Sequence, residues 1–168
     1  MQFHGQLLQF PKEVKLLITA FIITLSIGFF TGINFVKATS TFQVKGIETN
    51  YLGNEKEIDA PEMQFKKSKK EILTLVHNHI LSMSIIFLLL GGILSLTTVN
   101  KKLKKILLLE PFISIVLTFG GIYILWSGVL WFKYIIMISG ILMVTSFVLS
   151  AFLILKESIF LNKVTSKK

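Results

Sequence analysis

The chain has 168 residues, of which 52% are hydrophobic and only 16% are charged, and its formal net charge is +9. A soluble domain of this length could not cover so much apolar surface, because small domains leave a large share of their surface in water. All basic residues are Lys and they flank apolar runs, which argues against nucleic acid as a partner. The absence of Cys excludes disulfides, iron–sulfur clusters and thiol catalysis.

Four apolar runs predict four transmembrane helices, because about 20 residues cross a hydrocarbon core of about 30 Å. The predicted spans are residues 16–36, 76–98, 106–127 and 134–155. Uninterrupted runs of this length are typical of helices, since transmembrane strands are shorter and alternate in polarity. The predicted fold is therefore all-α, a single integral membrane four-helix bundle that keeps its first span and contacts the lipid bilayer.

The segment between the first two predicted spans, residues 37–71, is the one sizeable polar stretch. Its 35 residues include seven Lys and six acidic residues, and they are too few for an independent enzyme domain. We expect this extracytoplasmic loop to form a cap over one end of the bundle. Weak alternation over Thr41–Val44 favours a short strand within it.

The distribution of Lys near helix ends predicts the orientation. Four Lys lie in Asn100–Lys105, and the C-terminal tail carries Lys156, Lys163, Lys167 and Lys168. Both segments are expected on the cytoplasmic side of a bacterial inner membrane, with the N-terminus also inside. Lysines 66, 67, 69 and 70 in the outer loop count against this orientation.

Aromatic and small residues complete the membrane pattern. Trp126, Trp131 and Tyr134 predict an aromatic belt at the outer boundary. Three pairs of small residues at i, i+4 spacing favour close helix–helix contact within the bundle, rather than a dedicated dimer face. These pairs are Gly28 with Gly32, Gly91 with Ser95, and Ser146 with Ser150.

His77 and His79, at the outer start of the second span, are the first candidate site. Imidazole and thioether groups bind copper, zinc or the iron of haem b, so Met83 and Met137 are candidate ligands beside the two His. Glu71 lies two turns before His79 and completes the candidate metal set. Residues at i and i+2 point about 200° apart on a helix, which favours His79 alone as the ligand. The alternative is that both His are interfacial polar residues that hydrogen-bond the loop.

Glu110, followed by Pro111, is the second candidate site. A carboxylate inside a membrane helix is costly and indicates proton or ion handling by default. The alternative is a shallow acid that reaches the interface and pairs with a nearby Lys. Hydroxyl residues of the first span are expected to bond their own helix backbone.

No catalytic motif is present, so the sequence favours a non-enzymatic protein. Large apolar helix surfaces predict an accessory subunit, or an assembly and stability factor, of a bacterial membrane complex, with other membrane subunits as partners. A haem- or metal-binding electron-transfer protein that uses His77 and His79 is the first alternative. A small transporter is the second, and it requires Glu110 to lie among other polar groups.

Overall fold

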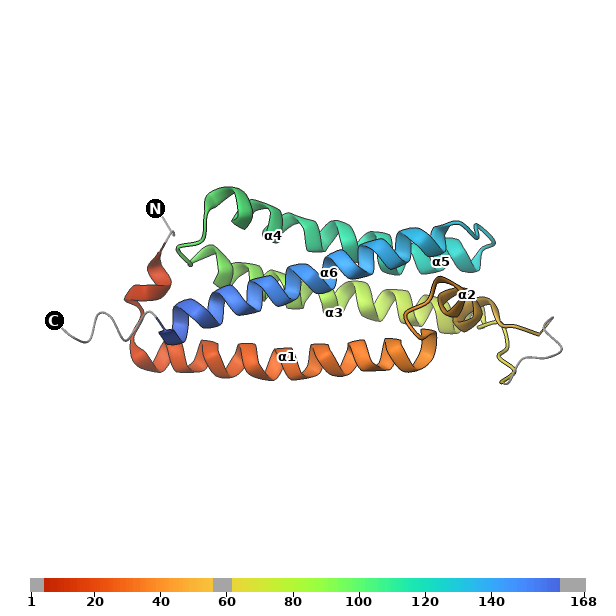
Figure 1. The fold of residues 1–168 in the computed structure, drawn as a ribbon, viewed down its shortest axis with the longest axis horizontal. Helices are drawn as coiled ribbons and strands as arrows, with labels where there is room; N and C mark the ends of the chain where they lie inside the picture. Colours follow the sequence, from red (N-terminus) through yellow and green to blue (C-terminus); the bar gives the residue numbers. More distant parts are fainter. Residues whose placement is uncertain (1–4, 56–61, 161–168) are drawn as a thin grey trace.

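Four long helical segments lie side by side in the computed structural model, which describes residues 5–55 and 62–160 (Figure 1). They are α1 (Lys12–Ser40), α3 (Lys69–Ser95), α4 (Lys101–Ile115) continued through the π-helical turn η2 (Val116–Gly120) into α5 (Gly121–Trp126), and α6 (Phe132–Leu155). The shorter elements are the 3-10 turn η1 (Gln6–Gln9), the helix α2 (Val44–Leu52) and the π-helical turn η3 (Lys156–Phe160). Each long segment is long and apolar enough to cross a membrane, with mean hydropathy between 1.9 and 2.4. The predicted all-α, four-span membrane fold is confirmed.

Each of the four long segments begins before the apolar run that predicted it, because polar residues form part of the first turns of the helices. Ser68 caps α3: its hydroxyl accepts the Glu71 N–H, and the Glu71 carboxylate accepts the Ser68 N–H. This reciprocal capping box is a standard helix start. Asn100 caps α4 by accepting the Lys102 N–H, so the lysine-rich segment forms the first turns of a helix rather than a loop.

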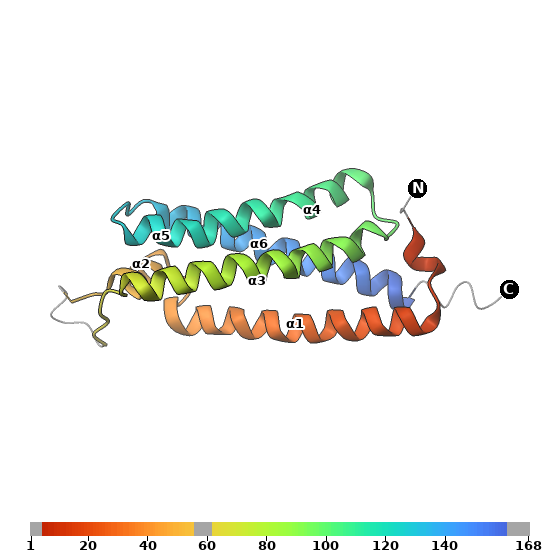
Figure 2. The same cartoon turned by 180° about the vertical axis from the view of Figure 1, so that it is seen from behind.

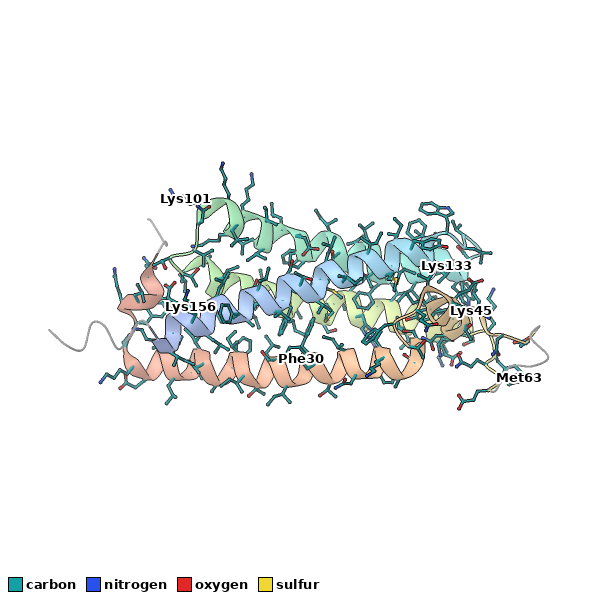
Figure 3. The ribbon with its side chains drawn as sticks, in the orientation of Figure 1. Phe30, Lys45, Met63, Lys101, Lys133 and Lys156 are labelled. Atoms are coloured by element: carbon teal, nitrogen blue, oxygen red, sulfur yellow. The ribbon has the colours of Figure 1, made fainter. Side chains whose placement is uncertain are left out.

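Both described chain ends and the turn between α3 and α4 lie at one end of the molecule, and α2 lies at the other (Figure 1). Lys101 and Lys156 mark the first end, and Lys45 and Lys133 mark the second (Figure 3). Four spans give this arrangement, because an even number of crossings returns the chain to its starting side. Lys163, Lys167 and Lys168, which support the predicted orientation, lie outside the described residues.

The buried core lies mainly between α3, α4 with its continuation, and α6. Phe147 of α6 is 1% exposed and meets Phe87 of α3 edge-on, with ring centroids 6.2 Å apart. Gly91 lets α3 approach α4 closely, because a Cβ there would meet a methyl group of Leu108 at 2.9 Å. For this glycine the predicted role in helix–helix contact is confirmed.

α1 contributes little to the buried core. Of its most apolar 18 residues, 11% are buried, the same share as in α3, compared with 44% for α4 with α5 and 39% for α6. The buried apolar side chain of α1 is Ile22, whereas α3 contributes four, Ile72, Phe87, Leu90 and Leu94. It runs along the bundle below α3 when the molecule is seen from behind (Figure 2). Gly28 and Gly32 are exposed, and a Cβ added to either would meet nothing within 4 Å. The prediction that these two glycines contact another helix of the bundle is therefore wrong.

The described parts of the segment between α1 and α3, residues 41–55 and 62–68, form a cap on this segment's end of the bundle through α2 and contacts with α5 and α6. No strand is present in residues 5–55 and 62–160, so the short strand predicted at Thr41–Val44 is wrong. Thr41 and Phe42 adopt left-handed backbone angles, with φ of 52° and 55°, which turn the chain into α2. Gly46 is required at this corner, because a Cβ there would lie 1.9 Å from the Ser40 carbonyl oxygen.

Trp126, at the end of α5, attaches the cap to the bundle. Its indole N–H donates to the Lys67 carbonyl oxygen at 2.7 Å, and the Lys66 ammonium lies 5.0 Å from the ring centroid. Lys133 of α6 forms an ion pair with Glu48 of α2. Tyr51 of α2 is also largely buried, and this burial raises the pKa of its phenol to about 12. Trp126 is thus an anchor for the cap, beyond its predicted place in an aromatic belt.

Candidate functional site

A seam of polar side chains runs between α4 and α6, inside two spans that are otherwise apolar. Glu110 lies five residues beyond Lys105, which places it about 7 Å further along the helix. Its two carboxylate oxygens accept hydrogen bonds from the hydroxyls of Ser114 and Ser146. Ser114 is one turn along the same helix, and Ser146 comes from α6. The carboxylate therefore points across the helix interface, and not toward a lysine at the membrane surface as the alternative reading of the sequence expected.

A second polar contact lies deeper along the same interface. The hydroxyls of Thr118 and Ser139 are 2.7 Å apart, and both residues are buried. Ser139 and Ser146 are seven residues apart on α6, so the two contacts are separated by about 10 Å along the helix. Thr118 belongs to the π-helical turn η2, a local rearrangement of the helix that is frequent at functional sites.

Pro111 sits inside α4, directly after Glu110, and is fully buried. Proline lacks the N–H that would bond the carbonyl four residues earlier, so the Leu107 carbonyl loses its usual helix partner. The site thus combines a carboxylate and two hydroxyls, and the preceding turn of α4 has one backbone carbonyl whose usual helical hydrogen bond is removed.

An open groove lies beside this seam on the side of the bundle. Its volume is about 410 Å³, and the surface that faces it is almost entirely apolar, although Lys105, Glu110, Ser114 and Ser139 are among the lining residues. The rest of the lining is aliphatic: Ile106, Leu109, Ile113, Leu117, Ile135, Ile138 and Leu142. Small-molecule sites have volumes of about 300–1,000 Å³ and similar apolar walls with few polar groups.

His77 and His79, the other candidate site, both lie within the regular helix α3. The Nδ1 atom of His79 is 2.8 Å from the Leu75 carbonyl oxygen, and its ring centroid is 4.7 Å from that of Phe119. Nδ1 therefore carries the proton and donates, which leaves Nε2 as the nitrogen able to bind a metal. Both His77 and His79 are exposed, and their positions two residues apart place them on different faces of the helix.

The remaining candidate ligands have other surroundings. The Glu71 carboxylate is engaged in the capping box of α3. Met83 and Met137 are half-buried and pack against the hydrophobic core. Among residues 5–55 and 62–160, no group of three or more His, Asp or Glu side chains is placed to hold a metal ion.

The end of the bundle that holds the turn between α3 and α4 has polar contacts that sequence reasoning missed. Glu157, 3% exposed, accepts hydrogen bonds from the backbone N–H and the hydroxyl of Thr98, both at 2.8 Å. The Lys104 ammonium donates to the carbonyls of Ser95 and Thr97 at 3.0 and 2.6 Å. These contacts fasten η3 and the start of α4 to the turn between α3 and α4. The segment 95–104 lacks a sequence signal for this role, because its partner Glu157 is remote in the chain.

Comparison with known proteins gives one match. Residues 41–165 match the Aq_1264_TM family, which is described as a transmembrane helical domain. The matched region starts directly after α1 and includes the cap, α3, α4 and α6. No curated protein and no solved structure matches the chain.

Proposed function

The chain belongs to the Aq_1264_TM family of transmembrane helical domains, and on that premise we propose that it is a non-enzymatic accessory subunit of a larger membrane complex. In this proposal it assembles with another membrane protein and stabilises it. The contact is made by the outward face of α1, which includes Gly28, Gly32 and Phe35. We place it in a bacterial cytoplasmic membrane with both chain ends inside, on the distribution of Lys near the helix ends.

The observation that carries the proposal is the small contribution of α1 to the core. This helix is long and apolar, but Ile22 is its one buried apolar side chain. The principal aromatic contact that joins its middle to the bundle is Phe29, which stacks on Phe147. α1 also precedes the region that matches the family, residues 41–165.

The small and uncharged residues of the outward face favour another transmembrane helix as the partner. Gly28 and Gly32 lie four residues apart with open space above both, and small residues at this spacing let two helix backbones approach closely in a membrane. Phe35, 68% exposed, lies on the same face one further turn along. The face carries no charge between Leu16 and Val36, which suits an apolar helix rather than a soluble protein.

A crosslinking experiment in the native membrane tests this proposal. A photoreactive phenylalanine analogue at Phe35 is expected to form one discrete adduct with another membrane protein, and the same analogue at Ile113, on the outside of α4, is not. Replacing both glycines by Ile is expected to reduce the adduct about tenfold, because such helix contacts contribute about 1–2 kcal/mol. An adduct with twice the mass of the chain, or one unaffected by the Gly substitutions, would contradict it.

Metal or haem binding at His79 is the second candidate function. The Nδ1 contact with the Leu75 carbonyl supports it, because metal-binding His side chains usually donate their second ring nitrogen to such a group. A visible spectrum and metal analysis of the purified protein test this alternative directly.

A further inference from the structure

We propose that Glu110, Ser114 and Ser146 form a binding site for a small monovalent cation, a proton or Na⁺, within the membrane. This site is independent of the outward face of α1 and belongs to the opposite part of the molecule, between α4 and α6.

The first argument is the balance of charge. An ionised carboxylate in apolar surroundings is expensive unless a positive charge neutralises it. The two groups that contact the Glu110 oxygens are serine hydroxyls, which donate hydrogen bonds but carry no charge. A bound proton or Na⁺ supplies the missing charge.

The second argument concerns the other charged groups near the site. On α4, the Lys104 ammonium is held by the carbonyls of Ser95 and Thr97. Lys105 lines the groove beside the site and is exposed. Of the helices packed against α4, α3 has no ionisable residue from Ile80 to Ser95, and α6 has none from Ile135 to Leu155. Among the described residues that line the groove, Lys105 is therefore the one cation that could neutralise Glu110 in place of a bound ion. An experiment must control for it.

The third argument is the set of oxygen atoms. Hard monovalent cations are held by carboxylate, hydroxyl and carbonyl oxygens, and interrupted membrane helices supply such carbonyls. Pro111 removes the usual helix partner of the Leu107 carbonyl, which belongs to the turn of α4 that precedes Glu110. If the bound cation is a proton, the two serine hydroxyls can hydrogen-bond the carboxyl group in either state. They donate to the ionised form and can accept from the protonated form.

The fourth argument is the surroundings of the site. Glu110 and Ser114 are among the lining residues of the groove of about 410 Å³, but the surface that faces the groove is almost entirely apolar. Thr118 and Ser139 continue the polar seam about 10 Å deeper. The carboxyl group therefore lies behind an apolar wall, where an unneutralised charge is costly.

Modification by dicyclohexylcarbodiimide tests the proposal, because this apolar reagent reacts with protonated carboxyl groups in membrane interiors. The full chain in lipid nanodiscs is treated at several values between about pH 5 and pH 9, and modified residues are identified by peptide mass. We expect modification at Glu110 that declines as pH rises and that E110Q abolishes. Protection by Na⁺ but not by K⁺ identifies Na⁺ as a ligand, and equal effects of the two salts identify the proton alone.

Two matched serine variants keep the test decisive if E110Q is poorly folded. S146A removes one hydroxyl donor from Glu110 and is expected to raise the pH of half-maximal modification by about one unit. S150A, one turn further along α6, is expected to leave that pH unchanged. K105Q distinguishes a cation site from an ion pair between Glu110 and Lys105. If Lys105 neutralised Glu110, the pH of half-maximal modification would change greatly in K105Q and would stay the same in S146A. That pattern, or an unmodified Glu110 throughout the pH range, would overturn the proposal.

Discussion

The phenyl ring of Phe29 in α1 lies parallel to that of Phe147 in α6, with ring centroids 3.8 Å apart and an interplanar angle of 3°. Phe87 of α3 meets both rings edge-on, so three spans share one aromatic cluster. This cluster connects α1 to the core, and it divides α1 into an inward side and an outward side.

Breaking this cluster should loosen α1 more than other changes on the same helix. F29A is expected to lower the free energy of unfolding in detergent, because an aromatic pair contributes about 0.5–1.5 kcal/mol beyond its buried area. The matched control is F30A, whose side chain is 48% exposed to the membrane side and should cost little. Thermal unfolding of the two variants and of F147A measures the difference. Equal midpoints for F29A and F30A would show that the stacking does not hold α1.

The anchor of the cap can be tested with one conservative change. W126F keeps an aromatic ring but removes the indole N–H that donates to the Lys67 carbonyl, a loss of about 1 kcal/mol. We expect faster tryptic cleavage in the segment 41–68, because the end of the cap opens more often. W131F is the control, since Trp131 is 59% exposed. The anchor assignment fails if both variants are cleaved at the wild-type rate.

The proposed orientation predicts a labelling pattern for single cysteines, which can be introduced freely because the chain has none. Cysteines at Asn54 and Ser127 should react with an impermeant thiol reagent added to intact cells. A cysteine at Asn100 should react only after the membrane is made permeable. Reaction at Asn100 in intact cells would invert the orientation while leaving the four spans unchanged.

The metal-binding alternative predicts different roles for the two His residues. If the purified protein shows a haem or copper spectrum, H79A should abolish it and H77A should leave most of it intact, because the two side chains point to different faces of α3. Neutral imidazole is the ligand, so bound metal should be lost on acidification. Equal loss in both variants would mean that α3 is unwound at these residues.

The positions of the four spans could be predicted from sequence because their apolar runs match the thickness of a membrane. α2 was missed because nine residues of mixed polarity carry little periodic signal and are stabilised by contacts with α5 and α6. The start of α3 did have a signal, Ser68 followed three residues later by Glu71.

The candidate site was only half visible in the sequence. Glu110 was identified because a carboxylate interrupts an apolar run, and Ser114 follows it at the i+4 spacing of one helix face. Ser146 could not be assigned to Glu110, since that pairing depends on how α4 and α6 are rotated against each other. The outward direction of Gly28 and Gly32 was hidden for the same reason, because Leu16–Val36 is apolar on every side.

The size of the assembly in its own membrane tests the central proposal most directly. The protein is extracted from native membranes in a mild detergent, and its mass is measured beside that of the variant with both Gly28 and Gly32 replaced by Ile. The accessory-subunit proposal predicts that the wild-type chain elutes within a larger complex with a different membrane protein, and that the variant elutes alone with its four-span fold intact. A wild-type chain that elutes alone, or as a complex of its own copies, would contradict it.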